Sequence, residues 1–291
     1  MARSNMPYHQ FPAHERDSLL GRNRNAPTGA STTTTPWRLT QLKTHLHQPV
    51  SRRYTDLILL ICYIITGLLD SSAVFIWGSF VSMQTGNTVY AGLGLLAGVD
   101  QASGDRSLKA LISITSFCGG SFFFACLHRH LFGGPRVRGA LALSFALQTL
   151  CIAVAAVITG VYRPPRGAGL GWTTAVPLAL VAFQGSGQAV ASRVLQFSAL
   201  TSVVLTSIYC DLFSAPVLGA SSVAGNPDEW RRLGAVLALV VGVVMGGFWA
   251  KSEVGLQGAL WTAVGLKAGI TVTWLWWREE KVGGDEEEEE E

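Results

Sequence analysis

The sequence predicts an all-α membrane protein, a polytopic helix bundle of about six spans with two further broken or re-entrant segments. Of the 291 residues, 49% are hydrophobic and only 14% are charged, whereas soluble domains carry roughly 25% charged residues. The charges gather toward the two ends of the chain, and successive apolar runs fill the stretch between residues 57 and 277. Runs of this length can cross about 30 Å of hydrocarbon.

Two charged arms flank one apolar domain. Residues 1–52 form a basic arm interrupted by prolines, and residues 278–291 form an acidic tail. Their low hydrophobicity predicts that both are disordered. Residues 53–277 form the transmembrane domain, whose partner is the lipid bilayer. The net charge of +3 averages these unlike parts, so it gives no reason to expect a nucleic-acid partner.

Six segments are long and apolar enough to be read as spans. They are residues 57–80, 110–127, 140–161, 175–191, 233–250 and 255–277. Two other apolar stretches, 81–98 and 194–210, contain polar groups, and each follows directly on a span. We predict that these two are broken or re-entrant pieces and do not cross fully.

The distribution of basic residues supports this count. With two incomplete stretches, the N-terminal arm, the loops 128–138 and 211–232 and the C-terminal tail all face the cytosol. The loops 99–109, 162–174 and 251–254, which carry fewer Lys and Arg residues, then face outward. Cytoplasmic loops carry an excess of Lys and Arg, so both termini are predicted to be cytosolic.

Small residues spaced four apart predict close contacts between helices, because they let two backbones approach in lipid. The chain has 32 glycines. Three pairs have this spacing: Gly94 and Gly98, Gly242 and Gly246, and Gly265 and Gly269.

The two interrupted stretches resemble each other and suggest an internal repeat. Residues 67–70 (GLLD) precede 85–88 (TGNT), and residues 185–188 (GSGQ) precede 206–209 (TSIY). The second match is degenerate, so chance similarity is an open alternative. A true repeat would give three spans per half and an inverted arrangement, the plan of many secondary transporters.

Asp70 lies inside the first span. A charged side chain at the bilayer centre costs about 2.5–3.5 kcal/mol on insertion scales, so it must face a cavity, be paired or be protonated. One interpretation is a proton, cation or substrate contact. The other is an acid that stabilises helix packing by capping the chain at Ser71 and Ser72.

The stretch Gln84-Thr85-Gly86-Asn87-Thr88 is the sharpest motif. A glycine among hydrogen-bonding side chains is typical of a helix break, where freed backbone groups line a cavity. We therefore expect it to bind a polar solute or an ion. The alternative is a capped helix start, with Thr85 or Asn87 as N-cap of a helix over residues 91–98.

Lys267 is the second charge within a span. It precedes Trp277, in the aromatic belt, by ten residues, which is about 15 Å at 1.5 Å per residue. One hypothesis is that Lys267 faces the bundle interior and pairs with Asp70 or with the dipole of a broken helix. A lysine that snorkels to the headgroups is the alternative.

Further polar residues mark the second half of the chain. Gln184 and Gln188 are four residues apart, so they share one helix face, and they could line a polar path. Thr206 lies in the second interrupted stretch. Sequence motifs for common enzyme classes are lacking, so no enzyme is expected, and neither a metal site nor a cofactor is predicted.

The residues Gly67 and Asp70, followed by Phe80 and the Thr85-Gly86-Asn87-Thr88 segment, resemble the YoaK-like family of membrane proteins of unknown function. The resemblance covers about residues 53–277. Residues 185–189 and 205–212 resemble later family segments, but Ser207 and Asp211 replace a glycine and an asparagine there. Membership implies a multi-span membrane protein and supplies no substrate.

The leading hypothesis is secondary transport of an unidentified small molecule or ion, bound near the membrane midplane at the broken helices. Asp70 and Lys267 would be coupling or gating charges. The other site residues would be Gln84, Thr85, Gly86, Asn87, Thr88, Gln188 and Thr206. The alternative is a scaffold or assembly protein that acts through its cytosolic arms. Either function is compatible with a homo-oligomer.

Overall fold

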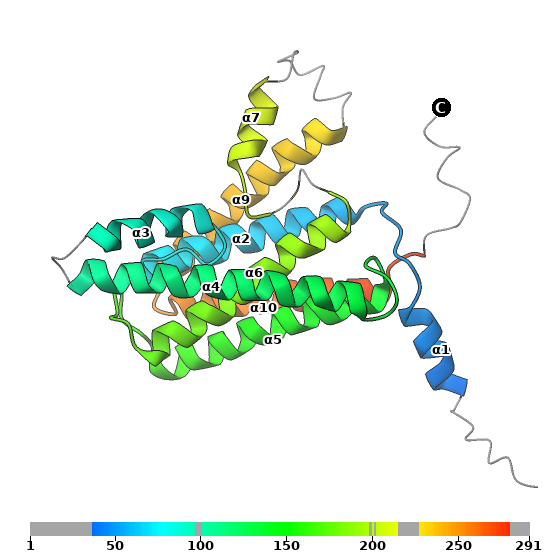
Figure 1. Ribbon diagram of the computed structural model, residues 1–291, viewed down its shortest axis with the longest axis horizontal. Coiled ribbons are helices and arrows are strands. Elements are labelled where there is room, and N and C mark those ends of the chain that lie inside the picture. Colours follow the sequence, from blue (N-terminus) through cyan, green and yellow to red (C-terminus); the bar gives the residue numbers. More distant parts are fainter. Residues whose placement is uncertain (1–36, 97–100, 198–199, 201, 215–226, 280–291) are drawn as a thin grey trace, which may run out of the picture.

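The computed structural model describes residues 37–96, 101–197, 200, 202–214 and 227–279. Its named elements are all helices, so the predicted all-α bundle is confirmed (Figure 1). In chain order they are α1 (Trp37–Leu46), α2 (Thr55–Trp77), α3 (Gln84–Leu96), α4 (Gln101–His130), α5 (Arg138–Tyr162), α6 (Trp172–Val194), α7 (Thr206–Ser214), α9 (Pro227–Lys251) and α10 (Leu256–Leu275).

The arms meet the described residues only at their inner ends. Helix α1 occupies part of the segment 1–52, where the sequence predicts disorder. Residues 1–36 and 280–291, which hold most of the basic arm and of the acidic tail, lie outside the described residues. Residues Trp37–Leu46 are therefore helical, and not disordered as predicted.

Among the described residues, four helices are long and apolar enough to cross a membrane: α2, the Gly104–His130 part of α4, α5 and α9. Helices α6 and α10 occupy the positions of the fourth and sixth predicted spans. Their 23 and 20 residues correspond to about 34 and 30 Å at 1.5 Å per residue. Each of the six segments predicted from hydropathy thus coincides with one long helix.

Each interrupted stretch contains a break in helix followed by a short helix, although α7 begins only at Thr206, near the end of the stretch 194–210. Helix α3 has 13 residues and α7 has nine, or about 20 and 14 Å, too short to cross about 30 Å of hydrocarbon. Residues 78–83 separate α2 from α3, and residues 195–205 separate α6 from α7. Helix α3 packs along α4, whereas α7 touches α9 (Figure 1).

The long helices pack in pairs. Helix α2 lies against α9, α4 against α6, and α5 against both α10 and α6. The first pair approaches closely because Gly67 and Gly242 face each other's backbones: a Cβ atom on Gly67 would clash with the Leu239 carbonyl and lie 2.8 Å from the Val243 nitrogen.

The predicted small-residue pairs have different outcomes. Gly242 and Gly246 both pack against the backbone of α2, so that prediction is confirmed. Gly94 packs on Ser107 of α4, while its partner Gly98 lies outside the described residues. Within the described part of the chain, no atom lies within 4 Å of a Cβ atom built on Gly265 or Gly269, so this pair forms no close contact there.

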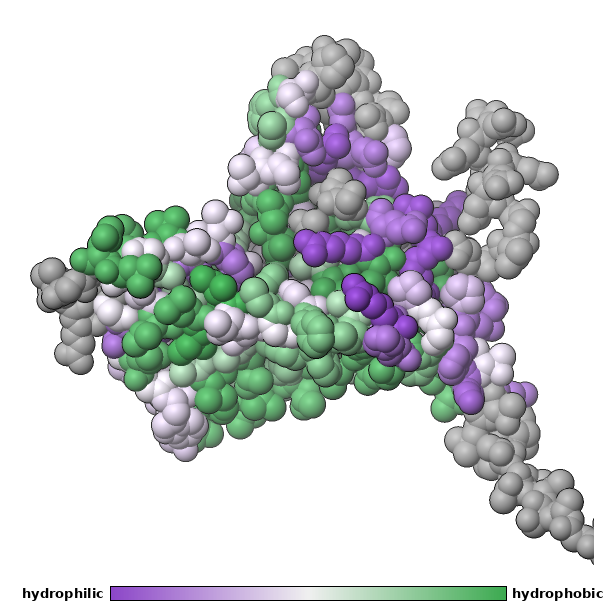
Figure 2. All heavy atoms as spheres, viewed as in Figure 1, coloured by the Kyte–Doolittle hydropathy of each residue, from purple (hydrophilic) through white to green (hydrophobic). Residues whose placement is uncertain are grey.

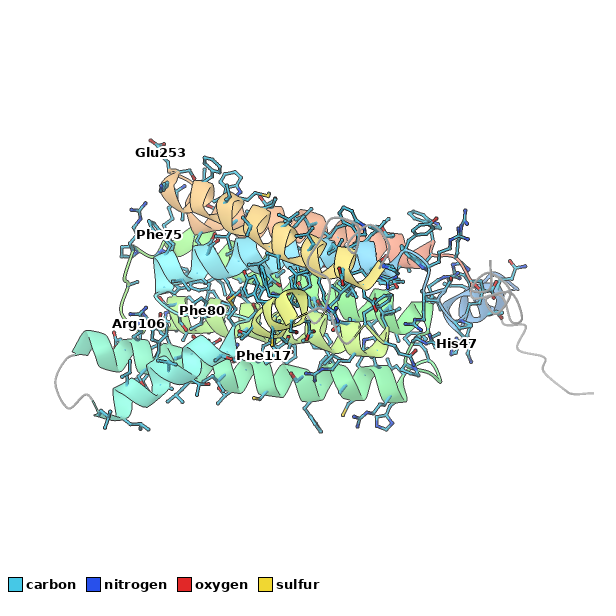
Figure 3. All side chains as sticks on the ribbon, turned by 90° about the horizontal axis from the view of Figure 1, so that it is seen from above. His47, Phe75, Phe80, Arg106, Phe117 and Glu253 are labelled. Carbon is cyan, nitrogen blue, oxygen red and sulfur yellow. The ribbon has the colours of Figure 1, made fainter. Side chains whose placement is uncertain are left out.

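The loops between the long helices lie at the two ends of the bundle. At one end, isolated backbone bridges join Pro49 to Val137 and Val50 to Glu279, which brings together the N-terminal segment, the α4–α5 loop and the end of the chain. The Arg231 guanidinium binds the Asp56 carboxylate there at 3.1 Å. His47 and Glu253 lie at opposite ends of the bundle (Figure 3).

At the other end, the Gly167 N–H donates to the Ile76 carbonyl at 3.0 Å, so the α5–α6 loop covers the end of α2. Figure 2 shows apolar residues over much of the visible face of the bundle, with hydrophilic residues gathered near α1 and around the junction of α7 and α9. An apolar middle between polar ends is what a bilayer requires.

Candidate functional site

The carboxylate of Asp70 holds the start of the α3 segment. Asp70 is 2% exposed, and its Oδ1 accepts hydrogen bonds from the backbone N–H groups of Val81 at 2.8 Å and Ser82 at 3.0 Å. Its Oδ2 accepts from the Ser82 hydroxyl. Free N–H groups at a helix start favour a negative charge. Asp70 therefore caps the interruption after α2. It does not cap the chain at Ser71 and Ser72, as one interpretation proposed.

Asn87 is fully buried and uses both ends of its amide to hold the same link. Its Oδ1 accepts from the Ser79 hydroxyl at 2.9 Å and the Phe80 N–H at 3.0 Å. Its Nδ2 donates to the Phe80 carbonyl at 2.8 Å, to Gln84 Oε1 at 2.9 Å and to the Ser113 hydroxyl at 3.0 Å. These bonds tie residues 79–80, α3 and α4 into one unit.

The remaining motif residues divide between packing and exposure. Gly86 leaves space for the Phe80 ring, because a Cβ atom there would lie 2.6 Å from the ring. Thr85 and Thr88 are exposed on the outer side of α3, and the Thr88 hydroxyl donates to the Gln84 carbonyl. Helix α3 begins at Gln84, so neither Thr85 nor Asn87 is the N-cap of a helix over residues 91–98.

Two cations from α4, which sequence reasoning treated only as loop charges, cap the C-terminus of α2. Arg106 Nε donates to the Gly78 carbonyl at 2.9 Å, and Lys109 Nζ donates to the Trp77 carbonyl at 3.2 Å. Positive charge is favoured at a helix C-terminus. Phe80 and Arg106 lie near this end of the bundle (Figure 3). Arg106 and Lys109 thus join α4 to the end of α2.

A second group of polar side chains lies in the middle of the bundle. We call it the central cluster. It consists of Thr66 of α2, Ser144 and Gln148 of α5, Gln184 and Gln188 of α6, and Lys267 of α10. Each of these helices places its polar residues well inside its length, and the side chains of all six residues are 2% exposed or less. Four different helices therefore converge on one buried polar region.

Lys267 is fully buried, so it does not snorkel to the headgroups. Its ammonium donates to Gln148 Oε1 and lies 5.0 Å from the centre of the Phe145 ring. Gln148 Nε2 in turn donates to the Ser144 hydroxyl at 3.1 Å. Among the described residues no carboxylate forms an ion pair with Lys267, so the expected pair with Asp70 is wrong and the partner is an amide.

Gln188 joins three segments of the chain. Its Nε2 donates to the Thr66 hydroxyl at 3.0 Å, to the Cys62 carbonyl at 3.3 Å and to the Ser202 hydroxyl at 3.4 Å. The adjacent Gly187 touches Gln148, since a Cβ atom there would lie 2.7 Å from the amide of that side chain. The Lys267–Gln148 pair and Gln188 are thus neighbours across one glycine.

The structure separates the predicted site residues into two places. Asp70, Gln84, Gly86 and Asn87 lie at the α2–α3 junction, whereas Lys267 and Gln188 lie in the central cluster. Thr85, Thr88 and Thr206 are exposed and belong to neither. Sequence reasoning missed Gln148 and Thr66. A glutamine inside the apolar run 140–161 was the available signal for the first.

Comparison with known proteins supplies a family. Residues 58–273 match the family described as "Protein of unknown function (DUF1275)". No curated protein and no solved structure matches the chain. The match spans most of the predicted transmembrane domain and includes both the α2–α3 junction and the central cluster, so the resemblance to a multi-span membrane family is confirmed. The chain belongs to the family of proteins of unknown function DUF1275.

Proposed function

We propose that the protein is a secondary transporter of a small solute, and that the solute binds at the central cluster. One observation carries the proposal: a fully buried lysine donates to the Gln148 amide oxygen of α5, and among the described residues no carboxylate forms an ion pair with it. Ionisable residues inside membrane spans are costly, and they mark substrate and ion pathways.

The depth of the cluster supports a site near the midplane. Lys267 lies 11 residues after Leu256, the first residue of α10, and eight before Leu275, the last. At 1.5 Å per residue it is about 16 and 12 Å from the two ends. Thr66 is likewise 11 residues from each end of α2. A solute bound here would be far from both surfaces, as alternating access requires.

The predicted roles change with the geometry. Lys267 and Gln188 remain site residues, and Gln148, Gln184 and Thr66 join them. Asp70 and Asn87 hold the α2–α3 junction, because each uses its polar atoms on backbone and side-chain groups of that junction. The broken helices would then orient the spans that carry the site.

The packing of the helices supports a 3+3 inverted repeat. Suppose that α2, α3, α4 and α5 correspond in order to α6, α7, α9 and α10. The contact between α2 and α9 then corresponds to the contact between α6 and α4. The contact between α3 and α4 corresponds to the contact between α7 and α9. The contact between α5 and α6 then corresponds to the contact between α10 and α2. The contact between α5 and α10 corresponds to itself.

The corresponding polar residues behave alike. Asp70 of α2 binds Ser82, which precedes α3, and Gln188 of α6 binds Ser202, which precedes α7. In each half a polar residue of the first helix is bonded to a serine before the short helix. This agreement between distant segments supports the repeat beyond the degenerate sequence match.

We further propose six spans with both termini in the cytosol. The end of the bundle that carries α1 and residue 279 also carries Arg52, Arg136, Arg138 and Arg231. An excess of basic residues marks the cytosolic side.

Transport is tested with purified protein in liposomes. The liposomes are loaded in turn with amino acids, hydroxycarboxylates, sugars and amines, and exchange of the same radiolabelled compound is measured. At least one compound should exchange faster than in liposomes without the protein, and Lys267→Met should abolish that exchange. The matched control is Lys251→Met, at the exposed end of α9. The scaffold alternative would be favoured if deleting the arms destroyed the function of the protein in cells while Lys267→Met retained it.

A further inference from the structure

Two kinds of unsatisfied group meet in the central cluster, and they require opposite partners. Lys267 offers a buried positive charge, while Gln184 and Gln188 offer buried amide oxygens with no donor within the described residues. We propose that the solute is a small carboxylate that carries its own O–H or N–H donor, as hydroxy acids and amino acids do. This inference rests on the proposed site and names its substrate class.

The Lys267 end selects a negative charge. An ammonium has three N–H donors, and the only hydrogen bond from Lys267 that the described residues provide goes to Gln148 Oε1. The Phe145 ring supplies a weak electrostatic contact at 5.0 Å. An isolated buried charge is strongly unfavourable unless it is paired. A carboxylate placed here would supply both the opposite charge and acceptors for the remaining donors.

The orientations of the two glutamine amides are set by their neighbours. Gln188 Nε2 lies 3.3 Å from the Cys62 carbonyl, and Gln184 Nε2 lies 3.0 Å from the Val181 carbonyl. A carbonyl oxygen can only accept, so the NH₂ group must be on that side in each residue. The oxygens are therefore the atoms without partners, and they require a donor.

A chain of contacts through Gln148 connects the two ends. Gln184 and Gln188 are one helical turn apart, so they share a face of α6, and Gly187 on the adjoining part of that face touches Gln148. Gln148 is the residue that Lys267 contacts. Gln148 thus contacts both Lys267 and the residue of α6 that precedes Gln188.

Other solute classes fit this arrangement less well. An organic cation would meet the Lys267 ammonium, and the central cluster contains no carboxylate that could compensate for the repulsion. A neutral sugar would satisfy the amide oxygens but leave the ammonium without an opposite charge. A carboxylate without a donor would satisfy Lys267 only.

Binding is tested in detergent with matched sets of three compounds on the full chain. One set is 2-hydroxypropanoate, propanoate and 2-hydroxypropanamide; another is glycine, acetate and glycinamide; longer acids of up to six carbons extend each set. The measurement is the rise in melting temperature with concentration, followed by tryptophan fluorescence. At least one hydroxy acid or amino acid should bind about 10-fold or more tightly than both of its analogues, since a charge-assisted hydrogen bond contributes roughly that factor.

Variants assign each end of the molecule. Lys267→Met should abolish the preference for the acid over its amide, while Lys267→Arg should keep it in part. Gln184→Leu combined with Gln188→Leu should abolish the preference for the acid with a donor over the plain carboxylate. A purely structural role for these residues would lower stability without altering either preference.

Three results would overturn the assignment: no acid stabilises the wild-type protein, the neutral amide binds as well as the acid, or Lys267→Met retains the preference. The wild-type comparison decides the question even if the variants do not fold. Because binding is measured in detergent without transport, acids that bind but do not exchange in liposomes would contradict only the transport proposal. Exchange of a sugar or an amine, together with no binding of any acid, would contradict only the assignment of the solute as a carboxylate.

Discussion

The Asp70 carboxylate accepts a hydrogen bond from the Val81 backbone N–H at 2.8 Å, across the point where α2 ends and α3 begins. Together with the bonds from Ser82, this contact makes the most conspicuous charge of the first span part of a helix junction. The consequence is that a change at Asp70 should be read first as a change in stability.

Replacing Asp70 by Asn should destabilise the protein by about 1–3 kcal/mol, the usual cost of leaving buried hydrogen-bond donors without a good acceptor. The amide keeps one oxygen but presents an NH₂ group to the Ser82 side. The measurement is the free energy of unfolding in detergent by denaturant titration. Asp228→Asn, at a carboxylate that is 61% exposed, is the control and should cost at most about 1 kcal/mol. Unchanged stability with lost exchange would instead assign Asp70 to the transport step.

Replacing Gly67 by Ala should weaken the α2–α9 contact. The new Cβ atom would meet the Leu239 carbonyl and the Val243 nitrogen, and backbone atoms cannot move aside as a flexible side chain can. Overpacking of this kind costs typically 1–3 kcal/mol. Gly265→Ala in α10 is the matched control, because it meets no neighbouring atom, and it should be neutral or stabilising by up to about 1 kcal/mol. Equal effects of the two substitutions would show that the contact is not tight.

Gly86 and Phe80 should be energetically coupled. Gly86→Ala places a methyl group against the Phe80 ring, so the single substitution should destabilise the α2–α3 junction. Phe80→Leu removes part of that ring, and the double variant should lose less stability than the two single changes added together. A double-mutant cycle on unfolding free energies measures this coupling, which for contacting residues is about 0.5–3 kcal/mol. Strict additivity would disprove the contact.

The proposed orientation predicts which loops react with a membrane-impermeant thiol reagent. In a variant without the five native cysteines, Gly167→Cys in the α5–α6 loop should be labelled in intact cells, because that loop is proposed to face outward. Gly134→Cys in the α4–α5 loop should be labelled only after the membrane is opened. The new Cβ atom meets no neighbouring atom at position 167, where the φ of 71° strains any side chain, and lies 3.1 Å from the Val137 side chain at position 134. The reverse labelling pattern would invert the topology and leave the fold unchanged.

The sequence predicted the helices better than it predicted the site. The positions of the long helices follow from runs of apolar residues, and the breaks after α2 and α6 follow from polar groups in the runs 81–98 and 194–210. Both are local properties of the sequence. The burial of Lys267 was also predictable, because its depth exceeds the reach of a lysine stem.

The partners of the polar residues could not be predicted in the same way. Lys267 contacts Gln148, which lies 119 residues away in the chain, and no spacing rule connects α10 with α5. Asn87 and the Thr85-Gly86 pair had the appearance of a binding motif, but Asn87 is saturated by the residues that it holds together. Whether a polar group is occupied or available depends on what reaches it in space.

Composition alone thus determined that the chain is a helical membrane protein, because the free energy of placing a segment in hydrocarbon depends on the residues of that segment. Only the tertiary structure decided that Asp70 completes a helix junction while Lys267, Gln184 and Gln188 keep unused hydrogen-bonding capacity in the middle of the bundle. The physical reason is that a buried polar atom is satisfied or unsatisfied by neighbours from other helices, and the packing of those helices sets which neighbours it has.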